Sequence, residues 1–110
     1  MNKIFLTFVA LGTIASAYTM TCANVEIEDG RTGAITLNKR VAAATSFDIS
    51  GNAIYLTRGN TRYRASHDSG NFYILKNGDF VVVGKNRKQI AIMAKYENGD
   101  NLRFFECKTK

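Results

Sequence analysis

The sequence contains no proline, a single histidine and two cysteines among its 110 residues. It also has no low-complexity tract, and 45% of its residues are hydrophobic. Because a chain of this composition can bury an apolar core, a folded domain is favoured over a linker or a disordered tail. The sequence lacks a phosphate-binding glycine loop, a zinc-type cysteine pair and a calcium-binding loop. We therefore expect no metal and no cofactor.

No hydrophobic run is long enough to cross a membrane, since a spanning helix needs about 20 apolar residues. The longest run covers residues 4–14, follows the cationic start Met1-Asn2-Lys3 and ends before Ala15-Ser16-Ala17. A charged segment, an apolar segment and a small-residue segment in this order are typical of a secretory signal peptide. We predict a signal peptide over residues 1–17 and an exported mature domain over residues 18–110, located in a periplasm or outside the cell.

The two cysteines lie near the two ends of the predicted mature chain, at Cys22 and Cys107. A domain of this size buries only about 60–65% of the surface of its unfolded chain, so the core alone is marginal. An oxidising compartment favours a disulfide over two free thiols. We predict a Cys22–Cys107 disulfide that joins the first and last strands and stabilises the fold by about 4–5 kcal/mol.

Short segments with period-two alternation of apolar residues, separated by turn residues, dominate the mature chain. This pattern predicts an all-β fold, a small antiparallel meander of about eight strands that closes into a barrel, with a β-sandwich as the alternative. The dipeptide Asn77-Gly78 predicts a β-hairpin with a type I′ turn. Residues 38–46 are compatible with a helical turn or with a strand. The expected strands cover residues 25–28, 34–37, 53–57, 61–65, 71–75, 80–83, 89–96 and 102–107.

The formal net charge of +6 falls to +5 when Lys3 leaves with the signal peptide, because fourteen basic and nine acidic side chains remain. This charge favours anionic partners such as a glycan, lipid headgroups or a nucleic acid. Two basic clusters lie in or next to predicted turns, and they form a solvated rim or, if both lie at one end of the barrel, a binding patch. The clusters consist of Arg58, Arg62 and Arg64, and of Lys85, Arg87 and Lys88.

Catalysis has one candidate base, His67, which is followed by Asp68 and flanked by Ser66 and Ser69. Neighbouring residues of a strand point to opposite faces, so these side chains do not form a nucleophilic triad. A nuclease in which His67 moves protons and the arginines hold a phosphate is compatible with the sequence. A surface histidine without a catalytic role is the simpler interpretation, so we predict a binding protein and not an enzyme.

A small exported domain with a tyrosine and a cysteine at its start and the ending Phe105-Glu106-Cys107 resembles the periplasmic inhibitors of C-type lysozyme. That family is built on a small eight-stranded barrel and carries a Ser-Gly-x-Arg/Lys-Tyr motif followed by a Trp-x-Lys-Gly motif. In one register, the segment from Gly59 to Arg62-Tyr63 is similar to the first motif and Leu75-Lys76-Asn77-Gly78 is similar to the second. In the other register, Ser69-Gly70-Asn71-Phe72-Tyr73 has the spacing of the first motif.

The resemblance implies inhibition by occlusion, in which a rigid hairpin loop enters the active-site cleft of a lysozyme-type glycoside hydrolase. Ser69 or Lys76 would lie where the substrate sugar binds, and the Lys76 ammonium would pair with a catalytic carboxylate. The residues implied for the inhibitory loop are Ser69, Gly70, Tyr73, Lys76, Arg62 and Tyr63. The partner is therefore a protein under this hypothesis and an anionic polymer under the alternative. The sequence sets no oligomeric state.

Overall fold

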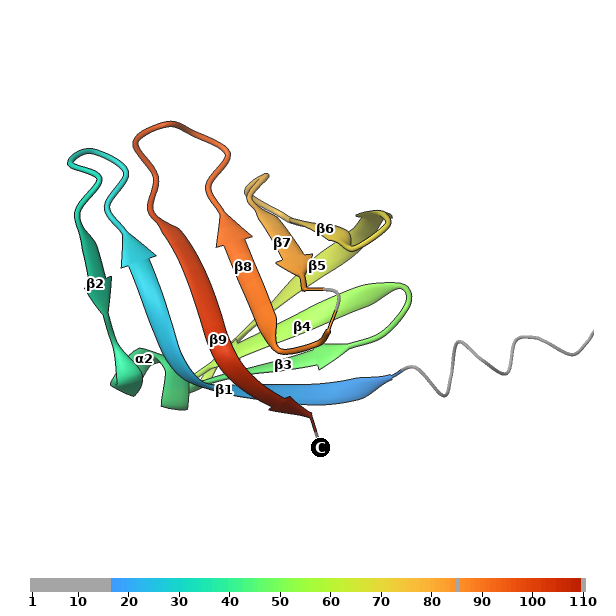
Figure 1. The fold of residues 1–110 in the computed structure, drawn as a ribbon. Helices are drawn as coiled ribbons and strands as arrows, with labels where there is room; N and C mark the ends of the chain where they lie inside the picture. The colour runs from blue at the N-terminus through green and yellow to red at the C-terminus, as the bar shows by residue number, and fades with distance from the viewer. Residues whose placement is uncertain (1–16, 85, 110) are drawn as a thin grey trace, which may run out of the picture.

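The computed structural model describes residues 17–84 and 86–109, so residues 1–16 of the predicted signal peptide and Lys85 lie outside the described residues. The described chain forms one antiparallel sheet of nine strands and one short helix (Figure 1). Eight strands close into a barrel through the pairing of β1 with β9, and β2 extends the sheet beyond it. The predicted all-β barrel is confirmed, and closure excludes the β-sandwich. The elements are β1 (Tyr18–Glu28), β2 (Ile35–Leu37), α2 (Lys39–Ala43), β3 (Thr45–Ile49), β4 (Ala53–Arg58), β5 (Thr61–Ser69), β6 (Phe72–Leu75), β7 (Phe80–Val83), β8 (Gln89–Met93) and β9 (Asn101–Thr109).

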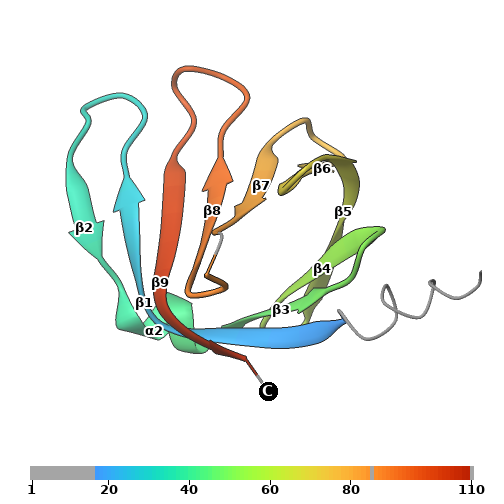
Figure 2. The ribbon, with the colours of Figure 1, turned by 45° about the vertical axis from the view of Figure 1, so that its right-hand side comes forward.

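Strand β1 is the longest strand and has three partners. One of its edges pairs with β9 from Met20 to Glu28. Its other edge pairs first with β3, over residues 18–21, and then with β2, over residues 26–28. Helix α2 connects β2 to β3 at the point where this edge changes partner (Figure 2).

The ambiguous segment 38–46 contains both a helix and the start of a strand. The side chain of Asn38 accepts a hydrogen bond from the Val41 N–H at 3.0 Å and caps α2. The alanines that follow favour the helix, and Ala42 is buried against the core. The Thr45 hydroxyl donates to the Val41 carbonyl at 2.7 Å, where the chain leaves the helix and enters β3.

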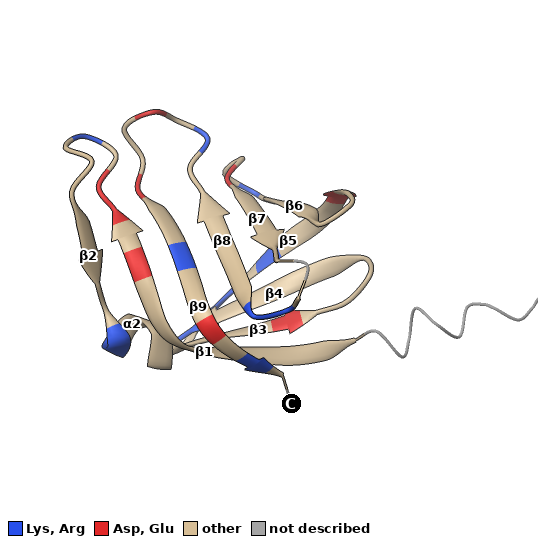
Figure 3. Cartoon of the chain, viewed as in Figure 1, with Lys and Arg blue, Asp and Glu red and all other residues tan. Residues whose placement is uncertain are grey.

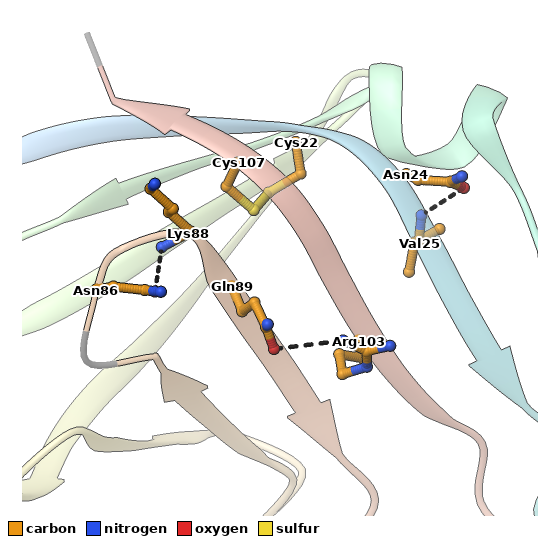
Figure 4. The surroundings of a disulfide bond; sticks show 8 residues. All are labelled: Cys22, Asn24, Val25, Asn86, Lys88, Gln89, Arg103 and Cys107. Carbon is orange, nitrogen blue, oxygen red and sulfur yellow. Dashed lines mark hydrogen bonds between the residues drawn. A yellow bond between two sulfur atoms is a disulfide. The ribbon is translucent and has the colours of Figure 1, made fainter.

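The core fills the barrel with inward-facing side chains from the eight strands. The rings of Phe47 and Phe104 meet edge to face at 5.0 Å, and both residues are fully buried. The predicted disulfide is present: Cys22 and Cys107 lie directly opposite each other in the β1–β9 ladder (Figure 4). Other fully buried side chains belong to Met20, Val25, Ile54, Val81 and Ile90.

Three local predictions need correction. Residues 67–69 belong to β5 and not to a loop, because the strand continues past His67 through a β-bulge that keeps it paired with β6. The β6–β7 hairpin is present, but its turn is not type I′, since only Gly78 has a positive φ, +94°. Strand β8 ends at Met93 and not at residue 96, because the Ala94 N–H donates to the Asn101 side chain at 2.8 Å.

Candidate functional site at the turn between β6 and β7

The two predicted basic clusters lie at opposite ends of the barrel. In an antiparallel meander, successive turns alternate between the two ends. Arg58 and Arg62 flank the β4–β5 turn, whereas Arg87 and Lys88 lie in the β7–β8 connection. Charged residues are accordingly spread over the ribbon (Figure 3). The alternative in which both clusters form a binding patch at one end of the barrel is therefore wrong.

Arg62 is occupied by contacts on its own sheet. Its guanidinium forms an ion pair with Asp48 at 3.2 Å, donates to the Thr57 hydroxyl and lies 4.5 Å from the centre of the Tyr55 ring. The ion pair is largely exposed, so its contribution to stability is small. The Asp48 carboxylate also offsets part of the positive charge of Arg62.

Three other arginines of the clusters also contact neighbouring groups. Arg58 donates to the Thr45 hydroxyl at 3.4 Å, and Arg64 donates to the Ser66 hydroxyl at 3.0 Å. The Arg87 guanidinium lies 4.3 Å from the centre of the Tyr18 ring. These contacts hold the three guanidinium groups at separate places on the barrel.

An open pocket of about 640 Å³ lies between the first part of β5 and the β6–β7 turn. Tyr63 lies opposite Leu56 in the ladder and remains 48% exposed, because it is close to an open end of the barrel. Most of the pocket surface is apolar, and cationic groups lie around it. The lining residues are Leu56, Arg62, Tyr63, Arg64, Leu75, Lys76 and Asn77. The structure thus brings together three predicted site residues, Arg62, Tyr63 and Lys76.

The β6–β7 turn that presents Lys76 is fixed by its own hydrogen bonds. The Gly78 N–H donates to the Leu75 carbonyl at 2.9 Å, and the Leu75 N–H donates to the Asp79 carbonyl at 2.8 Å. The Asp79 N–H also donates to the Asn77 side-chain oxygen at 2.9 Å. This pattern, with Gly78 in the left-handed region, is that of a three-residue loop closed by a bulge. The exposed Lys76 is therefore carried on a rigid backbone.

The second predicted loop, Ser69 and Gly70, lies in the β5–β6 turn. Gly70 adopts a φ of +52°, and its carbonyl accepts a hydrogen bond from His67 Nε2–H at 3.0 Å. The Ser69 hydroxyl donates to the Asp68 carboxylate at 3.3 Å. Strand β6 separates this turn from Lys76, and four strand residues span about 13 Å. The structure does not bring Ser69 and Lys76 together.

Tyr73 and His67 support this turn. Tyr73 is buried, its hydroxyl donates to the Ser50 carbonyl at 2.9 Å, and its ring packs edge to face on His67 at 5.1 Å. Burial raises the pKa of the Tyr73 phenol above its usual value of 10.0, and the nearby Tyr18 raises it further. Tyr73 was predicted in the binding loop, but its position makes it part of the barrel wall.

The contacts of His67 lie within its own turn and with Tyr73. The His67 Nε2–H donates to the Gly70 carbonyl, and the Asp68 carboxylate accepts a hydrogen bond from the Ser69 hydroxyl. Arg62, near the start of β5, and Arg58, at the end of β4, lie at the other end of the barrel. Among residues 17–84 and 86–109, no group of three or more His, Cys, Asp and Glu side chains could hold a metal ion.

Sequence patterns alone did not identify three residues that shape the site. Leu56 and Leu75 line the pocket, but alternation marked them only as strand residues. Asp79 braces the turn through its side chain, and the sequence Asn77-Gly78-Asp79 carried a signal for this, because Asn and Asp bond to nearby backbone in turns.

Comparison of the chain with protein-family models, with curated proteins and with solved structures found no match. Over the part of the chain that the structure describes, helices long and apolar enough to cross a membrane are absent.

Proposed function

We propose that the mature chain is an exported binding protein that inhibits a lysozyme-type glycoside hydrolase. The β6–β7 turn enters the active-site cleft, and the Lys76 ammonium pairs with a catalytic carboxylate. One observation carries the proposal: an exposed lysine lies on a turn whose backbone and side-chain hydrogen bonds fix its shape. A rigid loop loses little conformational entropy on binding, so more of the contact energy becomes affinity.

The pocket beside the turn supports this mode of binding. Glycoside hydrolases work with a pair of carboxylates, and an ammonium group next to them replaces water and substrate. The ion pair between the Lys76 ammonium and a catalytic carboxylate is strong only where water is excluded. Tyr63, Leu56 and Leu75 supply apolar surface next to Lys76 that a side chain from the rim of the cleft can cover.

Ser69 is the weaker candidate for insertion. Its hydroxyl already donates to Asp68, and the Asp68 carboxylate would be repelled by the carboxylates of the hydrolase. We therefore assign the inhibitory contact to Lys76.

The test measures lysis of peptidoglycan by a C-type lysozyme with the oxidised mature chain and its variants. Lys76→Ala should weaken inhibition by about 1–3 kcal/mol, which corresponds to about 5-fold to 150-fold. Lys108→Ala is the matched control, because it removes the same charge from the exposed end of β9. Ser69→Ala should inhibit like the unmodified protein.

Two results would reject the proposal. If the unmodified chain fails to inhibit lysozyme at large excess, the proposed inhibitory function is wrong. If Lys76→Ala inhibits as well as Lys108→Ala, the assigned contact is wrong.

A second function, binding of an anionic polymer, is favoured by Arg64 and Lys76, which line the same pocket as the half-exposed Tyr63. Salt distinguishes the two functions. Affinity for a polymer falls steeply as salt rises, because counterions compete with the protein. Inhibition of a basic lysozyme by a chain of charge +5 should survive moderate salt, because salt also screens their mutual repulsion.

A further inference from the structure

Strand β2 is the terminal strand of the sheet. It pairs with β1 along one edge, through Ile35↔Glu28, Thr36↔Ile27 and Leu37↔Glu26. Within the described residues, no strand pairs with its other edge, and Figures 1 and 2 show β2 beyond β1 with that edge open. Such an edge is a template on which another strand can pair.

The register shows which backbone groups face the open edge. The Asp29 N–H donates to the Ala34 carbonyl, and the Asn38 N–H donates to the Val25 carbonyl. Hydrogen-bonded pairs occur at every second residue of an antiparallel ladder, so Thr36 directs its N–H and C=O toward β1. Ile35 and Leu37 therefore direct their N–H and C=O groups away from β1.

Among the large aliphatic side chains of residues 17–84 and 86–109, those of the same two residues are the most exposed. Ile35 is 60% exposed and Leu37 is 63% exposed. Because they are two positions apart, both lie on the same face of β2. The edge thus offers four backbone groups and two apolar side chains at the spacing that an added strand requires.

The charges at the two ends of β2 identify the occupant. Lys39 and Arg40 follow the strand and are exposed, and Arg31 precedes it (Figure 3). Two copies paired about Thr36 would place Arg31 of each chain near Lys39 and Arg40 of the other, and these like charges repel. The same cations attract an acidic partner. The acids opposite Leu37 and Ile35 on β1 are already engaged, since Glu26 pairs with Arg103 and Glu28 accepts a hydrogen bond from Asn101. The Asp29 carboxylate lies at the Arg31 end of β2, where it accepts hydrogen bonds from the backbone N–H groups of Arg31 and Thr32. Its negative charge offsets the positive charge of Arg31, so the attraction for an acidic partner is strongest at the other end, beside α2.

We infer that the free edge of β2 is a docking site for an extended segment of another protein, which pairs antiparallel to Ile35–Leu37. The segment carries two β-branched or aliphatic residues at alternate positions that cover Ile35 and Leu37. Acidic residues precede them and lie opposite Lys39 and Arg40. This site is separate from the β6–β7 turn and does not depend on the function proposed above.

The test uses a fluorescein-labelled peptide, acetyl-Asp-Glu-Thr-Val-Thr-Val-Thr-amide, and a control peptide in which two lysines replace the acids. Binding is followed by fluorescence polarisation and by amide signals of the ¹⁵N-labelled full chain. The acidic peptide should bind at least about tenfold more tightly, a difference of about 1.4 kcal/mol. The amides of Ile35 and Leu37 should shift and become protected from exchange, whereas the Thr36 amide is protected already.

Two variants test the assignment. Leu37→Pro removes an N–H group that faces the open edge, and it breaks no hydrogen bond to β1. Binding of the acidic peptide should therefore fall about tenfold or more, while the thermal unfolding curve stays unchanged. The exposed pair Lys39→Glu and Arg40→Glu should invert the preference between the peptides without touching the sheet. Equal binding of both peptides, or amide shifts confined to other strands, would overturn the inference. Concentration-dependent dimerisation that Leu37→Pro abolishes would overturn it as well, because a second copy would then occupy the edge.

Discussion

The backbone N–H of Lys95 donates to Asp79 Oδ1 at 3.0 Å and so joins the β8–β9 connection to the β6–β7 turn. The two segments are also packed together, since a Cβ on Gly78 would lie 2.6 Å from Cδ of Lys95. The turn that presents Lys76 is therefore braced from outside as well as from within. A rigid turn in one hairpin depends here on a loop 16 residues further along the chain.

Replacement of Asp79 by alanine should loosen the Lys76 turn. The variant loses the bond from the Lys95 N–H and a side-chain contact with Asn77 at 3.2 Å. Because these groups are near the surface, the free energy of unfolding should fall by only about 1 kcal/mol. Inhibition of lysozyme should fall further than stability does, since the free loop must now be ordered on binding. Urea unfolding and the lysis assay measure the two effects.

Asp68→Ala is the control for this prediction, because it also removes a turn carboxylate, and the Asp68 side chain accepts from the neighbouring Ser69. It should leave inhibition unchanged. Equal loss of inhibition in both variants would show that the turn at Asp79 has no special role.

Loss of the disulfide should be the most costly single change. Cys22 and Cys107 are 85 residues apart, and a loop of that length gives a stabilisation of about 4–5 kcal/mol in the chain-entropy model. The variant with both cysteines replaced by alanine should unfold at a much lower urea concentration than the oxidised chain. Reduction of the unmodified protein should reproduce this shift. A reduced chain as stable as the oxidised one would contradict the prediction.

The sequence predicted those features of the fold that follow from local patterns. Alternation located eight of the nine strands but not β3, which begins in the ambiguous segment 38–46, and the two cysteines predicted the bond between β1 and β9. The type of the β6–β7 turn could not be predicted, because Asn77-Gly78 suits several turns and the bonds of Asp79 and Lys95 select one of them. The end of β8 was missed for the same reason, since the side chain of Asn101, from another strand, stops it.

The site was predicted only in part. Lys76, Arg62 and Tyr63, which belong to one of the two motif registers, lie around one pocket. The two basic clusters do not lie together, because successive turns of a meander alternate between the two ends of the barrel. The order of a turn along the chain, and not its composition, therefore decides which end it occupies. Residues 34–37 are predicted as a strand, and no local pattern shows that this strand ends the sheet. That position follows from the pairing of β1 with both β2 and the distant β9.

Tyr73 should make the protein less stable in strong base. Burial raises the pKa of its phenol above 10.0, so the folded state holds the proton more tightly than the unfolded state does. The stabilisation is complete below about pH 10 and is lost as the pH rises through the folded pKa. Tyr73→Phe should therefore flatten the decline of stability above pH 10. It should also cost about 1 kcal/mol at neutral pH, because the Ser50 carbonyl loses its donor.

Tyr96→Phe is the control for the alkaline effect, since the Tyr96 side chain is 65% exposed. Urea unfolding at neutral and alkaline pH, together with titration of phenolate absorbance, measures both variants. If the stability of the two variants depends on pH in the same way, burial of Tyr73 does not control the loss of stability above pH 10.

Gly30→Ala should separate the β1–β2 turn from the β8–β9 connection. A Cβ at this position would overlap the backbone of Asn98 and Gly99, and backbone cannot move aside as a side chain can. Overpacking of this kind costs about 1–3 kcal/mol. The bond from the Gly30 N–H to the Asp100 carboxylate, now 3.2 Å long, should be lost, so exchange of the Gly30 amide should accelerate.

Gly33→Ala gives the matched comparison in the same turn. Gly33 has a φ of +75° and no neighbour within 4 Å of an added Cβ, so only the left-handed backbone opposes the change. We expect a cost of about 1–2 kcal/mol with no effect on amides of the β8–β9 connection. Exchange rates around Asp100 distinguish the two causes. If Gly33→Ala changes those rates as much as Gly30→Ala does, the two connections are coupled through the turn as a whole and not through the contact at Gly30.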